Sequence, residues 1–191
     1  MFVFDVETCG KESSAVILSM ACVYFDARKE PSPKDLRDTA FFAKFSVNDQ
    51  VERLGRTMTR SSLSWWGKQC DIVKNMSFKP SADDIIIDDG IELMREWSKQ
   101  FELNDKCWVW ARGNLDQLVL DSIEEKLEIE PVFFFNRWRD VRTAVDLMTG
   151  STTGYCKVNY DGFDPAHHIM KHNPIDDCVL DAMMLMYGVE E

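Results

Sequence analysis

The sequence predicts an α/β protein built on a mixed, five-stranded sheet with helices on both faces. Its 191 residues suit a single domain spanning residues 1–191. The first quarter of the chain holds three apolar runs rich in β-formers, and the rest alternates helical periodicity with two further apolar runs. Strands close in sequence favour antiparallel pairing. Three such strands, followed by helices that alternate with two strands, indicate a mixed sheet.

Three strands are expected at the N-terminal end of the chain, over residues 2–7, 15–25 and 39–47. All three are apolar and rich in β-branched or aromatic residues. The segment 26–38 contains two prolines and many charges, so we expect it to be a loop or hairpin connection.

Two helices are expected next. Leu63, Trp66 and Cys70 lie at helical spacing and predict one face of a short helix. A longer helix follows, with Ser81 as its expected N-cap. Its buried stripe is expected to contain Ile87, Ile91, Met94 and Phe101.

The second half of the chain should add two strands and two helices. Strands are expected at residues 107–110 and 132–135, and a short helix is expected to end near Gly150. A helix over residues 115–127 separates the two strands. Its inward side chains are expected to be Leu115, Leu118, Ser122, Ile123 and Leu127.

The last helix has the clearest start. Asn173 is a good N-cap and Pro174 is favoured at the first helical position, so we expect a helix from there to Gly188. The preceding residues 150–165 are rich in glycine, threonine and aspartate and should form an exposed loop.

Composition excludes several classes of protein. The net charge of −11 argues against broad, non-specific binding to nucleic acid, so such a partner would have to be held locally. No apolar run approaches the ~18 residues of a membrane span, and no signal peptide is evident, so we expect a cytoplasmic protein. The cysteines lack zinc-site spacing and are expected to be reduced thiols. They are Cys9, Cys22, Cys70, Cys107, Cys156 and Cys178.

Two carboxylates on the first strand carry the strongest chemical signal. Asp5 and Glu7 are two positions apart, so their side chains point to the same face of the strand. Two acids on one face of an apolar strand repel each other and resist burial. A divalent metal ion is the usual partner for such a pair.

Three later residues extend this pattern. Asp116 lies where the strand at 107–110 gives way to a helix, and such corners present ligand groups in α/β sheets. His172 and Asp177 lie at the start of the last helix. Each residue alone is a weak signal, but their order along the chain is informative.

This order resembles that of the DEDDh group of 3′-to-5′ exonucleases, a branch of the ribonuclease H-like fold. Further similarity, in the same order, lies at residues 64–69, 110–113, 139–143 and 177–178. The resemblance extends over residues 2–187 and includes phage members of the group. It implies a ribonuclease H-like fold.

The resemblance also implies site roles. Asp5, Glu7, Asp116 and Asp177 would hold two divalent metal ions, Mg²⁺ or Mn²⁺. His172, the one histidine with an aspartate five residues later, would act as general base. Asp121 is the alternative to Asp116.

Substrate contacts are expected from five residues: Thr8, Trp65, Gln69, Arg112 and Arg142. Trp65 would either stack on a terminal base or pack against a neighbouring helix. Arg142 would either bind phosphate or pair with Asp140 or Asp146.

The expected function is hydrolysis of single-stranded DNA from its 3′ end, releasing nucleoside monophosphates. RNA is the rival substrate, and a non-catalytic nucleic-acid-binding module, a proofreading subunit and a small-molecule phosphatase are the other hypotheses. A homodimer is a further expectation from the resemblance, and no membrane partner is expected.

Overall fold

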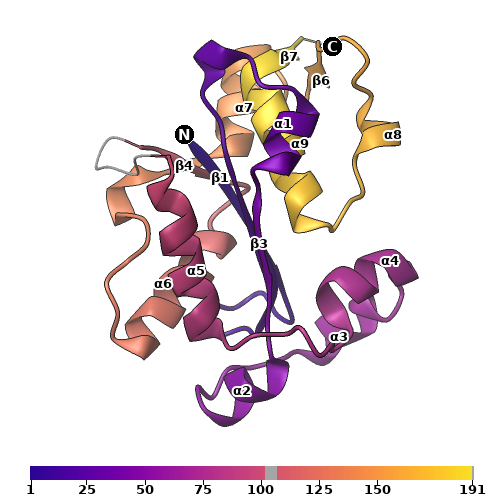
Figure 1. The fold of residues 1–191 in the computed structure, drawn as a ribbon. Helices are drawn as coiled ribbons and strands as arrows, with labels where there is room; N and C mark the ends of the chain where they lie inside the picture. The colour runs from indigo at the N-terminus through magenta and orange to yellow at the C-terminus, as the bar shows by residue number, and fades with distance from the viewer. Residues whose placement is uncertain (102–106, 191) are drawn as a thin grey trace.

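A computed structural model describes residues 1–101 and 107–190 and contains a five-stranded mixed sheet (Figure 1). The strand order is β3-β2-β1-β4-β5, with β1 in the centre. β1 is antiparallel to β2 and parallel to β4, β2 is antiparallel to β3, and β4 is parallel to β5. The antiparallel pairing of the first three strands is as predicted. The strands are β1 (Phe2–Thr8), β2 (Ile17–Tyr24), β3 (Phe41–Lys44), β4 (Val109–Ala111) and β5 (Trp138–Asp140).

The helices connect and cover these strands. The α-helices are α1 (Pro33–Asp38), α2 (Val47–Glu52), α3 (Arg60–Trp66), α4 (Asp71–Val73), α5 (Ile87–Lys99), α6 (Leu115–Leu127), α7 (Val141–Thr149), α8 (Pro165–His168) and α9 (Pro174–Tyr187). Shorter turns are the 3-10 helices η1 (Ala27–Lys29) and η3 (Phe135–Arg137) and the π-helical turn η2 (Lys74–Phe78). A small antiparallel pair joins β6 (Lys157–Val158) to β7 (Gly188–Val189).

The sheet is covered on both faces, as expected (Figure 1). Phe2 and Phe4 of β1 belong to a core completed by residues of α5 and α6. Val3 of β1 belongs to a second core completed by residues of α1, α7 and α9. Because side chains alternate along a strand, Asp5 and Glu7 share the parity of Val3 and lie toward the α9 side. This alternation brings both acids toward the start of the last helix.

The strand predicted at residues 132–135 is wrong. Val132 and Phe133 are buried in the core, but Phe134 and Phe135 are exposed and the chain turns through η3. The fifth strand is instead β5, in the arginine-rich segment that follows. Aromatic residues fit strands and apolar turns equally well, so the run alone did not identify the paired segment.

Two predictions about where helices begin are wrong. Part of segment 26–38, expected to be a loop, forms α1. A capping box between Ser32 and Asp35 begins α1, with Pro33 in the first turn. Ser81 does not cap α5, whose N-cap position is Ile86; Ser81 instead donates its hydroxyl to Asp84 at 2.7 Å.

Several predicted buried faces are shifted. Trp66 is buried as expected, but Leu63 and Cys70 on the same predicted face are exposed. Leu118, predicted to point inward, is 45% exposed, because α6 buries Val119 and Leu120 instead. The predicted stripe of α5 is confirmed at Ile87, Ile91 and Met94, with Phe101 partly buried against the same core.

The last helix is confirmed in detail. The Asn173 side chain accepts the backbone N–H of Ile175, and Pro174 is the first helical residue. None of the helices described has the length and apolar character needed to cross a membrane. All six cysteines are free thiols, in agreement with the sequence.

Candidate active site

The candidate site lies where the parallel strand β1 ends, next to the starts of α6 and α9. Asp5 is half-buried and one of its carboxylate oxygens, Oδ2, is inaccessible to solvent. Within the described part of the chain this oxygen accepts no hydrogen bond. A buried carboxylate oxygen without a donor is costly, so it points to a missing positive partner.

Asp116 reaches the same place from the first turn of α6. Its side chain is buried, with 6% exposed, and its Oδ1 accepts the backbone N–H of Val6 at 3.2 Å. This hydrogen bond ties the helix start to β1 between the two acids of that strand. Asp121, the alternative, lies further along α6, is half-buried and accepts a hydrogen bond from Gln117.

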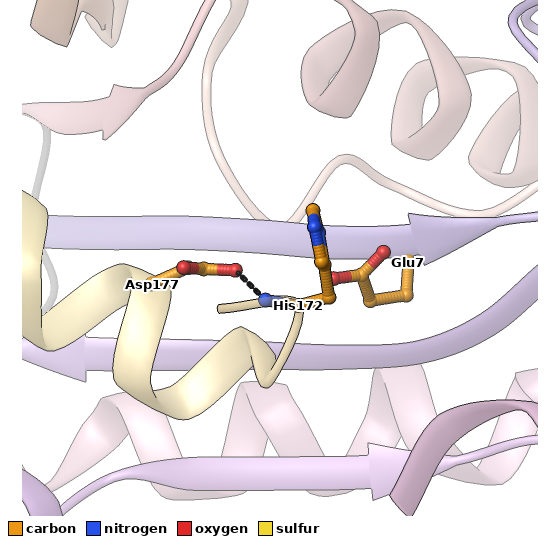
Figure 2. Close-up of side chains that lie close together, drawn as sticks. All are labelled: Glu7, His172 and Asp177. Atoms are coloured by element: carbon orange, nitrogen blue, oxygen red, sulfur yellow. Dashed lines mark hydrogen bonds between the residues drawn. The ribbon is translucent and has the colours of Figure 1, made fainter. Parts of the chain in front are cut away.

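His172 and Asp177 come from the loop before α9 and from its first turn. The backbone N–H of His172 donates to Asp177 Oδ2 at 3.0 Å, and Figure 2 shows this bond with the imidazole lying on the side of Glu7. One ligand atom each from Glu7, His172 and Asp177 lies within 4.8 Å of the others. Residues more than 160 positions apart therefore converge, as the sequence predicted.

The carboxylates raise one another's pKa values. Burial, followed by the charges of Asp116 and Glu7, raises the pKa of Asp5 well above its usual range. Burial, followed by the charge of Asp177, does the same to the pKa of Glu7. Burial also raises the pKa values of Asp116 and Asp177 to about 7, although each accepts a backbone hydrogen bond. The charges of Asp116 and Asp177 therefore act on both acids of β1.

The pKa of His172 is shifted in the opposite direction. Burial, and then the positive charge of Lys171, lower the pKa of His172. The imidazole is therefore neutral at pH 7 and has a nitrogen available to accept a proton. The Trp65 ring meets it edge-on, with 4.7 Å between centroids.

A fifth acid was not predicted from the sequence. Asp181 is buried on α9, and its carboxylate pairs with the Arg112 guanidinium, accepting Arg112 Nε at 3.0 Å. Asp181 is four residues after Asp177, so it lies one helical turn along the same face, and that spacing could have revealed it. Burial raises the pKa of Asp181, and Arg112 opposes the rise.

Three of the five expected substrate contacts lie near α3 and the end of β1. Trp65 is 40% exposed beside His172, and Gln69 donates its amide to the Trp65 carbonyl at 3.1 Å. Thr8, at the end of β1, donates its hydroxyl to Gly10 and accepts the indole N–H of Trp66 on its carbonyl.

The two arginines differ in their surroundings. The guanidinium of Arg112 pairs with Asp181, donates to the carbonyl of Gly154 and lies 4.2 Å from the Tyr155 ring centroid. Arg142 is exposed, and its charge lowers the pKa of Asp116. The two acids considered as partners for Arg142 accept backbone N–H groups instead: Asp140 those of Gly113 and Thr143, and Asp146 that of Gly154.

The residues present fit divalent metal ions. Hard cations such as Mg²⁺ and Mn²⁺ prefer carboxylate oxygens, and this site offers four carboxylates, including the unpartnered oxygen of Asp5. A bound cation would reverse the rise in the carboxyl pKa values, because it stabilises the ionised forms.

The chain is similar to known nucleases. The chain is 26% identical, over 211 aligned positions, to an exodeoxyribonuclease of Enterobacteria phage T4; the alignment covers 98% of this chain and 88% of the phage protein. Its fold resembles the nuclease domain of 3′hExo, a DEDDh family member solved with bound rAMP. The TM-score is 0.59 at 16% identity, covering 96% of this chain and 88% of that one. This likeness confirms the expected ribonuclease H-like fold class. A family model described as "3′-5′ exoribonuclease Rv2179c-like domain" matches residues 1–188, so the chain belongs to that family.

Proposed function

We propose that this member of a 3′-5′ exonuclease family hydrolyses phosphodiester bonds at single-stranded 3′ ends and releases nucleoside monophosphates. One observation carries the proposal: one ligand atom each of Glu7, His172 and Asp177 lies within 4.8 Å of the others, and the charges of Asp116 and Glu7 raise the pKa of Asp5. That set contains both a metal-binding group of acids and a neutral base.

The four acids would hold two divalent ions, Mg²⁺ or Mn²⁺. When bound, such ions activate water and stabilise the leaving oxygen of a phosphodiester. The protein's own contribution is to keep Asp5 and Glu7 rigid on a central strand. It also fixes Asp116 and Asp177 through the backbone N–H groups of Val6 and His172.

His172 would accept the proton of the attacking water. Its lowered pKa keeps the imidazole unprotonated at neutral pH, which is the state that a general base needs. The alternative role for His172 is that of a metal ligand, since it lies among the acids. We favour the base, because four carboxylates already supply the oxygen ligands that Mg²⁺ prefers.

The rim of the site supplies groups suited to a single strand. Trp65 is exposed beside His172 and would stack on a terminal base. Arg142 is exposed, acts on the charge of Asp116 and would bind a backbone phosphate. Thr8 and Gln69 lie beside Trp66 and Trp65 and would contact the same strand. Arg112 is already paired with Asp181, so its expected contact with phosphate would use the N–H groups left over.

We propose DNA as the substrate to test first, because the phage relative that matches nearly the whole chain is an exodeoxyribonuclease. RNA is the second candidate, because the family model is described as that of an exoribonuclease. Discrimination would require a contact to the 2′-hydroxyl of the sugar.

The test is a degradation time course on 5′-labelled single strands of DNA and RNA with identical sequence, in Mg²⁺ or Mn²⁺. The expected result is a ladder that shortens from the 3′ end and disappears in EDTA. Asp5→Ala should reduce the rate to background. His172→Ala should lower the rate by ~10²–10⁴-fold, the usual contribution of a positioned base.

Two matched controls separate chemistry from general damage. His167→Ala removes an exposed histidine that pairs with Asp164 on α8, and Asp121→Asn removes a carboxyl on α6 outside the acidic cluster. Both variants should retain the wild-type rate. A folded, metal-bound wild-type protein that degrades neither strand would contradict the proposal and favour a binding module.

A further inference from the structure

The segment that carries His172 is short and lacks regular structure. It links α8 to α9 over residues 169–173. Within it, the backbone of His172 has φ +65, a left-handed conformation that non-glycine residues adopt at a cost. Such a conformation persists only where surrounding contacts impose it. The bond from His172 N–H to Asp177 is one of these contacts.

A second anchor lies on the neighbouring acid, Asp176, whose side chain has no place in the catalytic cluster. Asp176 is 8% exposed, and both of its carboxylate oxygens are engaged. Oδ2 accepts the backbone N–H of Met170 at 2.9 Å, and Oδ1 accepts Nε of Arg37 at 2.8 Å. Met170 is two residues before His172, so Asp176 holds the incoming side of the segment.

Arg37 extends this anchor to the end of α8. Its NH2 group donates to the carbonyl of His168 at 2.6 Å, while its Nε binds Asp176. Arg37 belongs to α1, which packs beside α9 although 139 residues separate Arg37 from Asp176 (Figure 1). One guanidinium therefore ties the last residue of α8 to the first turn of α9, on the two sides of the segment.

We infer that Arg37 and Asp176 are positioning residues for His172. This inference rests on the proposed function, in which His172 is the general base. The pair acts on backbone atoms of residues 168 and 170 and so fixes where the imidazole stands relative to Glu7. Because Asp176 also holds the segment, the position of His172 does not depend on Asp177 alone. The Asp177 carboxylate can therefore also serve the metal site.

Loss of Arg37 should affect the rate of catalysis and not the binding of substrate or metal. Removing Arg37 leaves all four carboxylates of the metal site and the rim residue Trp65 in place. The Asp176–Met170 bond also remains, but the link from Asp176 to the His168 carbonyl is lost. A displacement of about 1 Å in a catalytic group can cost ~10²-fold in rate. We therefore expect kcat to fall while KM and the affinity for Mn²⁺ stay close to wild type.

The experiment is a double-variant cycle on the full chain. Arg37→Ala should lower kcat by about tenfold or more on single-stranded DNA or RNA, whichever the wild-type protein degrades. Arg37→Lys should recover part of the rate, because a lysine retains the charge but not the two-sided fork. In a His172→Ala background, Arg37→Ala should cause no further loss, because the base it positions is already gone.

Hydrogen exchange supplies a readout independent of activity. The backbone amides of residues 168–173 should exchange faster in Arg37→Ala than in wild type. The matched control is Arg53→Ala, which removes an arginine that pairs with Asp49 and Asp88 on the surface. It should change neither kcat nor exchange in this segment.

Two results would overturn the inference while leaving the proposed function intact. One is an equal loss from Arg37→Ala with and without His172, and the other is unchanged exchange over residues 168–173. A wild-type protein without nuclease activity would instead contradict the proposed function, and the exchange measurement would still report whether Arg37 holds the segment.

Discussion

Burial of single acidic residues in the site disfavours their ionised forms. Asp5 has an inaccessible oxygen with no donor among the described residues, and burial raises the pKa values of all four acids. Asp181 has its counterion in Arg112, so it sits in the same neighbourhood with its charge compensated. Substitution of Asp181 and substitution of the four site acids are therefore expected to have different effects.

The Arg112–Asp181 pair is largely buried, with 14% and 8% of the two side chains exposed. Asp181→Asn leaves the Arg112 charge in place without its partner, and breaking a buried pair in this way typically costs ~3–5 kcal/mol. We expect the free energy of unfolding in urea, measured in EDTA, to fall by about that amount. The double variant Arg112→Met/Asp181→Leu should recover much of the loss. If Asp181→Asn is as stable as wild type, the pair does not stabilise the fold.

Trp65 is the residue whose role the sequence left open. Its ring is 40% exposed and lies nearly perpendicular to the rings of Trp66 and His172, so part of the ring is accessible to a ligand. Stacking of an aromatic ring on a base contributes ~1–3 kcal/mol. Trp65→Ala should therefore raise KM for single strands by roughly 5- to 150-fold, and Trp65→Phe should restore most of the affinity.

The matched control for this substitution is Trp108→Ala, because Trp108 has a similar exposed fraction, 42%, and contacts Arg139 instead. KM should be unchanged in that variant. A fall in kcat without a change in KM in Trp65→Ala would show that Trp65 orients His172 and does not stack on substrate.

At the scale of elements, local signals predicted the sheet and the last helix better than the segments between them. The strand β1 and the cap of α9 depend on neighbours in sequence, so a short pattern is enough. The run from Phe133 to Phe135 splits between core and solvent, which depends on distant residues and is invisible locally. The capping box at Ser32 and Asp35 was present in the sequence but was outweighed by the prolines and charges around it.

In the candidate site too, local patterns were predictable and long-range pairings were not. Asp5, Glu7, Asp116, His172 and Asp177 follow a pattern that can be read in order along the chain, and the fold brings them together. Asp176 carries no such signal, because its partner Arg37 lies 139 residues away. Pairings over such distances have no signature in a single sequence.

The packing of α5 against β3 depends on a glycine. Gly90 on α5 faces the buried ring of Phe45, and a Cβ at this position would overlap that ring. Gly90→Ala gains up to ~1 kcal/mol of helix propensity but overpacks the core, which costs ~1–3 kcal/mol or more. We expect a net loss of ~1–2 kcal/mol in the free energy of unfolding.

The compensating change tests the cause of this loss. Phe45→Leu should be destabilising in the wild-type background and less so when combined with Gly90→Ala, because the smaller side chain gives the new methyl group room. Additive losses in a urea denaturation cycle would mean that Gly90 is needed for another reason.

At the scale of the whole molecule, the net charge of −11 includes a buried acidic cluster, so the stability of the metal-free protein should depend on pH. Asp116 and Asp177 have folded-state pKa values of about 7 against 3.8 for an ordinary aspartate. The folded state therefore keeps protons that the unfolded chain releases near pH 4. By linkage, this contribution to stability is complete below about pH 4 and is lost as pH rises through about 7.

The melting temperature in EDTA should accordingly be higher at about pH 5 than at about pH 8, and Asp116→Asn should reduce that difference.

Mn²⁺ should act in the opposite direction, because it binds the ionised carboxylates. At a concentration of ~100 times its Kd, a ligand adds ~2.7 kcal/mol, and each kcal/mol is worth ~2–4 °C for a chain of this size. Mn²⁺ should therefore raise the melting temperature by roughly 5–10 °C at pH 8 and much less at pH 5. Glu124 lies eight residues after Asp116 on α6, and burial raises its pKa to about 7. It contributes a pH slope of its own, which Mn²⁺ should leave unchanged in Asp5→Ala. An equal effect of Mn²⁺ at both pH values would mean that the ion does not bind the coupled acids.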